Sequence, residues 1–276
     1  MKKYLISELA TERAEGCAER DARYGFSISR GSLNGKKVSS VRVPREYTFT
    51  DKQRLLASMA VSEELKQLIP SEIMSSNTPV TVICLGNASL TADSLGPLCA
   101  KKIAATRALR LENPNAFRSL GGREITVITP GVSGHTGIEA LELLRACKPL
   151  LKTELVIAID SLKAIRRESL SSVIQLSTGG ITPGSAIGNS RLKISSEALG
   201  IPVISIGAPT AISSGSLICD ALMRAGITSM IEPVSEILKN EADFTVSAND
   251  LDIDVRRNAE IIAKAINLTL LGFAEA

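Results

Sequence analysis

The chain has 276 residues, with 32 Lys and Arg against 29 Asp and Glu, so its formal net charge at pH 7 is only +3. This balance provides no strong electrostatic attraction to nucleic acid or to anionic lipid. Hydrophobic residues make up 44% and charged residues 22%, an ordinary composition for a protein with one substantial core. No apolar run approaches the roughly 18 residues of a membrane-spanning helix, and the charged start is unlike a secretion signal. We therefore expect a cytoplasmic protein with neither nucleic acid nor membrane as a direct partner.

Scarce residue types exclude several kinds of site. Aromatic residues are only 3% of the chain and Trp is absent, which argues against a base-stacking surface for single-stranded nucleic acid. His135 is the only histidine in the sequence, so one chain cannot supply a zinc site with two imidazoles. Any catalytic group of the Ser/His/Asp or Cys/His kind would have to use His135 as its base. The five cysteines are widely spaced without a C-x-x-C pair, and we interpret them as free thiols: Cys17, Cys84, Cys99, Cys147 and Cys219.

The first part of the chain differs from the rest. Residues 1–50 are polar and mixed, and they are predicted to form an N-terminal extension with a strand pair around Gly35. Residues 51–276 are predicted to form a single α/β domain, which begins with a helix over residues 51–69.

From Pro79 onward, short runs rich in Val and Ile alternate with amphipathic stretches. The runs are nearly continuous in apolar residues, which is typical of strands covered on both faces. This β–α–β–α order predicts a parallel-rich sheet flanked by helices. The predicted strands are 80–86, 124–129, 154–160, 172–177 and 202–207, and the predicted helices are 94–111, 136–151 and 249–271.

Two carboxylates stand where an open α/β sheet collects its reacting groups, beyond the carboxyl ends of the strands. Asp93 lies in the polar segment after the first predicted strand, and Asp160 closes the third. An Asp before a helix is also a favoured N-cap, and Asp160 could instead tie down a neighbouring loop. If the two face one another, they cannot both ionise cheaply, and one charged and one protonated carboxyl can activate a water and protonate a leaving group.

Other polar groups near these strand ends give weaker signals. His135 lies in the Gly-rich segment 129–137 and is expected to be solvated. Lys163, Arg166 and Arg167 follow Asp160 and are expected on a solvated helix face. Residues 179–188 are rich in glycine but match neither phosphate-binding pattern.

Five motifs carry a family resemblance. GNASLTADSLGP, TPGVSGHTGIE, LVIAIDSLKA, STGGITPGSAIGNSR and LGIPVISIGAPT occur in the order found in the germination protease family of spore-forming bacteria, which this chain resembles from about Thr81 to Thr210. The resemblance implies an endopeptidase of the atypical aspartic type that degrades small acid-soluble spore DNA-binding proteins in the forespore or spore core. It implies that Asp93 and Asp160 are catalytic, without a metal or other cofactor. It also implies a three-layer phosphorylase/hydrolase-like fold, a homo-oligomer (a tetramer in the family) and a zymogen.

The chain also departs from the family pattern. Thr178 and Thr182 stand where the family has Asp and His, the family residue at the position of His135 is usually apolar, and the chain is short between Met230 and Phe244. Two alternatives stay open: a peptidase similar to those of hydrogenase maturation, with a metal-probing site, or a non-catalytic binding descendant. Self-processing is predicted at the bond between residues 8 and 9, ahead of a polar stretch expected to be exposed and flexible, unless residues 1–16 only form a frayed helix.

Overall fold

A computed structural model gives the structure of the chain. It describes residues 9–13, 15–45, 49–183, 192–231, 233–234, 237 and 244–272, with the backbone alone at residues 13 and 15–20.

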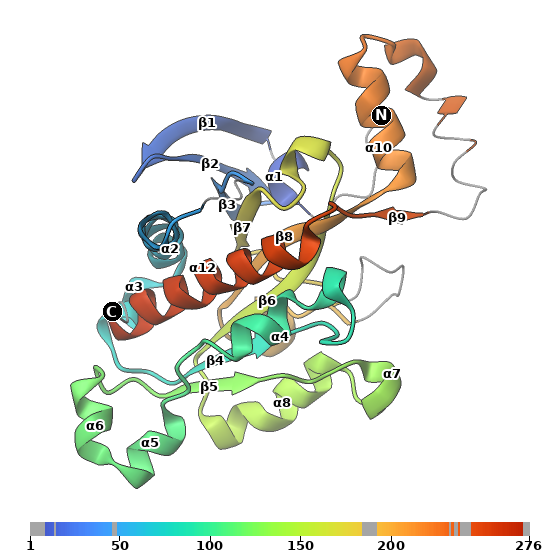
Figure 1. Ribbon diagram of the computed structural model, residues 1–276. Helices are drawn as coiled ribbons and strands as arrows, with labels where there is room; N and C mark the ends of the chain where they lie inside the picture. The colour runs from blue at the N-terminus through green and yellow to red at the C-terminus, as the bar shows by residue number, and fades with distance from the viewer. Residues whose placement is uncertain are drawn as a thin grey trace.

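One mixed sheet runs through the described part of the chain (Figure 1). Its strand order is β1-β2-β3-β7-β8-β6-β4-β5, and β9 pairs with the far end of β8. The strands are β1 (Glu15–Arg23), β2 (Phe26–Leu33), β3 (Lys36–Arg42), β4 (Val80–Cys84), β5 (Ile125–Ile128), β6 (Leu155–Ala164), β7 (Val173–Ser177), β8 (Val203–Ser213) and β9 (Thr245–Val246). Every strand predicted from Pro79 onward is therefore present.

The α/β class is confirmed, but parallel pairing is confined to one part of the sheet. Strands β5, β4, β6 and β8 are parallel neighbours, whereas the pairings of β1, β2, β3, β7 and β9 are antiparallel. The expected strand pair around Gly35 is the hairpin of β2 and β3, whose turn residues Asn34 and Gly35 have φ of 52° and 74°. Because β3 pairs with β7, this hairpin extends the central sheet.

Helices cover both faces of the sheet. The helices of the described part of the chain, which include some outside these two layers, are α1 (Ala10–Arg13), α2 (Asp51–Leu68), α3 (Ser71–Ser75), α4 (Leu95–Ala100), α5 (Arg107–Glu112), α6 (Pro114–Ser119), α7 (Ser133–Thr136), α8 (Ala140–Leu151), α9 (Ser196–Leu199), α10 (Ser214–Arg224) and α12 (Leu251–Leu271). Alternate residues of β6 separate the two layers. Ile157 and Ile159 pack in the core formed with α2, α4 and α12, whereas Val156 and Ala158 pack in a second core with α8 and α9.

The helix predicted over residues 94–111 is wrong, because the chain leaves the helix after Ala100 and enters α5 only at Arg107. Polar partners outside the helix hold the intervening backbone. The amide of Ala104 donates to Oδ1 of Asn267 (3.0 Å), and the amide of Thr106 donates to the carbonyl of Ile125 (3.0 Å). These bonds join the segment to α12 and β5, a tertiary effect that the local pattern does not contain.

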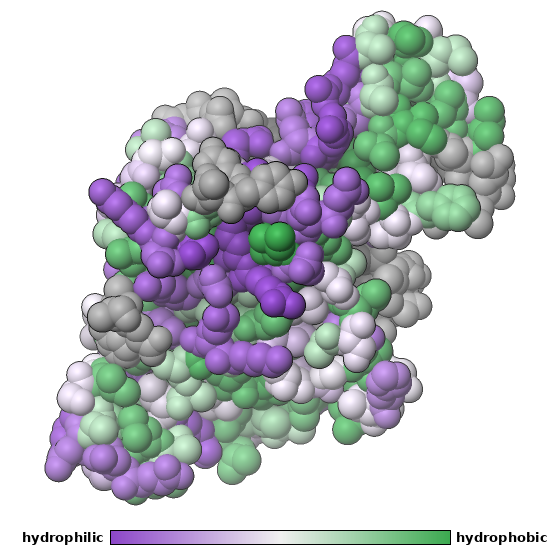
Figure 2. Space-filling view, in the orientation of Figure 1, coloured by the Kyte–Doolittle hydropathy of each residue, from purple (hydrophilic) through white to green (hydrophobic). Residues whose placement is uncertain are grey.

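One helical projection stands away from the sheet. It consists of α10 and the short 3₁₀ helix η4 (Thr228–Met230), and it follows directly from β8 (Figure 1). Hydrophobic residues gather on its surface in Figure 2. Within the described ranges, no helix combines the length and the apolar character needed to cross a membrane.

Candidate active site

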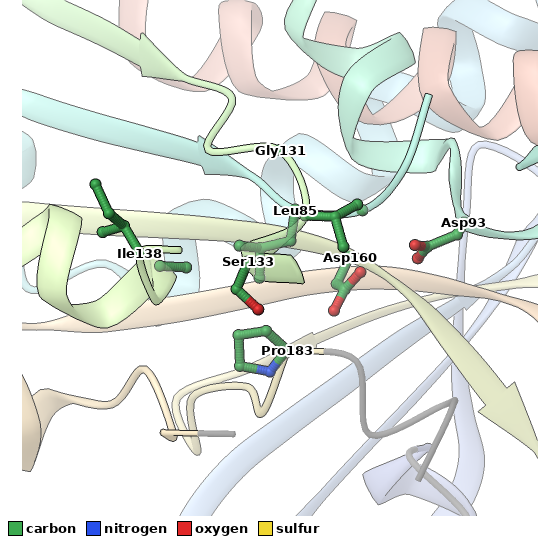
Figure 3. A pocket seen from close by; sticks show the side chains of 10 residues that line it. Leu85, Asp93, Gly131, Ser133, Ile138, Asp160 and Pro183 are labelled. Carbon is green, nitrogen blue, oxygen red and sulfur yellow. The ribbon is translucent and has the colours of Figure 1, made fainter. Parts of the chain in front are cut away.

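A pocket opens where β4 stops while its neighbour β6, and β8 beyond it, continue. Counting the solvent at its mouth, it measures about 440 Å³ (Figure 3). Its lining comes from four separate stretches of the chain, which meet only in the fold: Leu85, Gly86, Asp93, Gly131, Val132, Ser133, Ile138, Ala140, Asp160 and Pro183. Both predicted catalytic residues are therefore in the wall of the same pocket.

Asp160 reaches this pocket from within a strand. It was expected to close its strand, but β6 runs on to Ala164 because its pairing with β8 continues as far as Ile212. Cys84, the last residue of β4, pairs with Ile159, so Asp160 lies one position beyond the end of its shorter neighbour. Its side chain is buried, and Oδ1 accepts a hydrogen bond from the amide of Ser161 (2.8 Å).

Asp93 reaches the same pocket from a tight loop. It ends the 3₁₀ helix η1 (Thr91–Asp93), and its carbonyl oxygen accepts a hydrogen bond from the amide of Asn87 (2.9 Å). Gly86 permits this approach: it has φ of +114°, and a Cβ there would lie 2.1 Å from the carbonyl oxygen of Asp93. The hydroxyl of Thr210 on β8 donates to the carbonyl of Ala92 (2.6 Å) and ties the loop to the sheet.

The interpretation of Asp93 as the N-cap of the next helix is wrong. Ser94 holds the cap position of α4, and its side chain makes no capping hydrogen bond. Figure 3 shows the carboxylate of Asp93 directed toward Asp160 across the pocket. Asp93 thus lies one position before the cap of α4, and its carboxylate faces the second carboxylate.

The other polar residues singled out in the sequence lie elsewhere. His135 is exposed on α7 and does not line the pocket, as expected of a solvated histidine. Lys163 belongs to β6, and Arg166 and Arg167 are exposed after it, where Arg167 begins the short 3₁₀ helix η2 (Arg167–Ser169). Thr178 exchanges hydrogen bonds with the backbone of Lys37 on β3 (3.0 Å each), which binds the end of β7 to its neighbour.

Part of the Gly-rich segment lies outside the described residues, because residues 184–188 are among those left out. Thr182 is half-buried and is followed by Pro183, which forms one side of the pocket. In the described part of the chain, no three His, Cys, Asp or Glu side chains are close enough to hold a metal ion.

Several wall residues were not singled out from the sequence. Leu85, Ile138 and Pro183 are apolar, and nothing in their local pattern separates them from core residues. Ser133 falls in the segment 129–137, which was marked as a candidate for its place after a strand, but no role was assigned to it. The position of that segment after β5 was the available signal.

Near the N-terminus, the residue that follows the predicted cleavage bond is buried. Leu9 is fully buried in the core that contains Leu162 and Ile181. The carboxylate of Glu12 accepts hydrogen bonds from the amides of Ile165 (2.7 Å) and Arg166 (3.1 Å), so this segment is docked at the end of β6. Residue 8, the other side of the predicted cleavage bond, lies outside the described residues.

Comparisons with known proteins agree with these features. A family model described as germination protease matches residues 37–225. A germination protease of Caldanaerobacter subterraneus subsp. tengcongensis is 31% identical over 96% of this chain and 94% of its own length. That of Clostridium acetobutylicum is 30% identical over 77% of this chain and 72% of its own length, and that of Priestia megaterium is 36% identical over 70% and 51%. The chain therefore belongs to the germination protease family and is an endopeptidase.

Proposed function

We propose that this chain degrades small acid-soluble spore DNA-binding proteins during germination, with Asp93 and Asp160 activating the attacking water. The observation that carries the proposal is the meeting of these two carboxylates in one pocket, although 67 positions of the sequence separate them. The position of His135, exposed and not among the residues that line the pocket, favours the aspartates over an imidazole as the base.

The chemistry needs one carboxylate and one carboxylic acid. The ionised group takes a proton from water as the water oxygen bonds to the peptide carbonyl carbon. The protonated group then gives its proton to the amide nitrogen as the carbon–nitrogen bond breaks. Two carboxyl groups that share a pocket favour this division, because the second ionisation is opposed by the first charge. The burial of Asp160 strengthens that opposition, since burial disfavours a charged carboxylate.

The proposal extends to the setting of the reaction. The helices on both sides of the sheet support a three-layer, phosphorylase/hydrolase-like architecture, and the family supports action in the spore core. It also includes a homo-oligomer, supported by the apolar surface of the projection that carries α10.

The experiment is to incubate the purified protein with a small acid-soluble spore protein and to map the cut by mass spectrometry, with and without EDTA. Cleavage at one internal site that EDTA leaves intact is expected. Loss of cleavage in EDTA, restored by one added metal, would instead favour the peptidase of the hydrogenase-maturation kind. Binding without any cleavage would favour the non-catalytic descendant.

A further inference from the structure

Among the described residues, the wall that faces the two aspartates contains one further polar side chain. Of the described residues that line the pocket, Asp93, Asp160 and Ser133 carry polar side chains. Ser133 comes from α7, on the far side of the pocket from Asp93, and Figure 3 shows its hydroxyl oxygen directed toward the space between Asp160 and Pro183. A bound peptide that reaches the aspartates therefore passes this hydroxyl.

The hydroxyl of Ser133 makes no hydrogen bond to any residue that the structure describes. Two other hydroxyls in this region do have partners in the protein. The hydroxyl of Thr136 lies within hydrogen-bonding distance of the carbonyl of Ile138 (3.3 Å), and the hydroxyl of Ser94 donates to the carbonyl of Thr91 (2.9 Å). A hydroxyl that faces an open pocket bonds to water in the free protein, and a ligand can replace that water without leaving a polar group unpaired.

The rest of this wall is apolar and reaches the surface at Ile138. Ile138 is 49% exposed although it lines the pocket, and Val132 and Pro183 lie on the same pocket. An apolar side chain of a bound peptide would cover Ile138 and remove apolar area from water, which is favourable. The pocket therefore offers one apolar contact surface and one hydrogen-bond donor beside the carboxylates.

We infer that Ile138 and Ser133 form a specificity subsite: Ile138 packs against an apolar side chain next to the cleaved bond, and the Ser133 hydroxyl donates to a backbone carbonyl of the bound peptide. The inference rests on the proposed function and names the residues that select its substrate. Ser133 acts here as a donor and not as a nucleophile, because no imidazole lies in the pocket to take its proton.

The two contacts predict different patterns of loss. The apolar contact with Ile138 strengthens the binding only of peptides that have an apolar side chain next to the cleaved bond. A hydrogen bond to the peptide backbone strengthens the binding of every peptide. Removing the Ile138 side chain should therefore reduce the preference for apolar peptides, and removing the Ser133 hydroxyl should weaken the binding of all peptides alike.

The test measures binding in an Asp160→Asn background, so that cleavage does not consume the probe. The probes are two fluorescein-labelled peptides, residues 4–12 of this chain (YLISELATE) and the same peptide with Asn in place of Leu at residue 9. Fluorescence anisotropy gives Kd for each. Ile138→Ala should raise the Kd of the Leu peptide about 5- to 10-fold and that of the Asn peptide less than about 2-fold. Ser133→Ala should raise the Kd of both peptides about 3- to 10-fold, and Ser133→Thr should restore most of the lost affinity.

Ile253→Ala is the matched control, because Ile253 is 51% exposed on α12 and does not line the pocket. Its Kd values should equal those of the background protein. Equal effects of Ile138→Ala on both peptides, an unchanged Kd in Ser133→Ala, or no binding of either peptide would overturn the subsite. The proposed function is tested separately by wild-type cleavage of spore proteins, so a protein that cleaves but fails these binding tests keeps its function and loses the subsite.

Discussion

At the scale of single residues, the glycine after β4 decides whether Asp93 can reach the pocket. Gly86 combines a backbone conformation that L residues rarely adopt with direct contact to the carbonyl of Asp93. A side chain there would push the η1 loop away from the sheet. The position of one carboxylate thus depends on the absence of a Cβ seven residues earlier.

The variant Gly86→Ala tests this dependence. We expect it to lower the free energy of unfolding by about 2 kcal/mol or more and to remove most of the peptidase activity, because both backbone strain and the collision act on the Asp93 loop. Gly25→Ala is the control, since Gly25 has φ of +85° but no atom within 4 Å of the added Cβ. Urea denaturation should show a clearly smaller loss for Gly25→Ala, and equal losses would mean that the contact with Asp93 does not matter.

Buried thiols give a second prediction at this scale. Burial raises the pKa of Cys84 to about 12 and that of Cys99 well above its ordinary 9.0, so both stay protonated and unreactive near neutral pH. Native protein treated with iodoacetamide at pH 7.5 should remain unmodified at both cysteines and fully active, as peptide mapping and an activity assay would show. The half-buried Cys147 serves as the comparison. Rapid labelling of Cys84 in the folded state would contradict this account.

The same thiols fix the direction of a pH effect. The folded pKa of Cys84 is raised above that of the unfolded chain, so its contribution to stability is complete below about pH 9 and is lost as pH rises from about 9 to about 12. The free energy of unfolding should fall over that interval.

At the scale of elements, the sequence predicted those features that depend on local pattern. The five strands after Pro79 were predicted from continuous apolar runs and are all present, and the helices α2 and α12 were found within about two residues of their predicted ends. Where β6 and β8 end, and where the helix after Asp93 breaks, depends on partners far along the chain, such as Ile212 and Asn267. Those partners are invisible to a local pattern.

The candidate site divides in the same way. Asp93 and Asp160 were marked by their position after apolar runs and by a family resemblance, and the structure brings both to one pocket. Ile138 and Pro183 carry no chemistry of their own, so only the fold could identify them as pocket walls. Nothing in the local pattern marks Leu9 as a core residue, because its burial comes from contacts with distant strands.

Docking of α1 bears on self-processing. Because Leu9 is buried and Glu12 is bound at the end of β6, we predict that cleavage before Leu9 requires this segment to detach. Intact-mass analysis from pH 5 to 8 should find a new N-terminus at Leu9 in the wild type and none in Asp160→Asn. Glu12→Ala should speed the cut by loosening the segment, whereas Glu112→Ala, at an exposed position on α5, should not. The same cut in Asp160→Asn would mean that another protease makes it.

At the scale of the whole molecule, the projection that carries α10 exposes apolar residues that its own chain does not cover. Large side chains with at least 40% of their surface exposed occur along it: Ile218, Ile227 and Met230. Exposed apolar patches of this kind commonly mark protein interfaces, and symmetric homo-oligomers are the commonest assemblies.

Removing part of this surface should weaken the proposed homo-oligomer. We expect Ile218→Ser combined with Ile227→Ser to lower the mass seen by sedimentation equilibrium, while Leu150→Ser, at a residue 73% exposed on α8, should leave it unchanged. A monomeric wild type, or an unchanged mass in the double variant, would contradict this role of the projection.

The most direct test of the central claim compares Asp93→Asn and Asp160→Asn with the wild type on one spore-protein substrate. Each substitution keeps the shape of the side chain but removes its ability to take or give a proton, so kcat should fall by about 10²- to 10⁴-fold. The far-ultraviolet circular dichroism spectrum should stay that of the wild type, which separates chemistry from folding. A wild-type kcat in either folded variant would contradict the assignment of this pair as the catalytic groups.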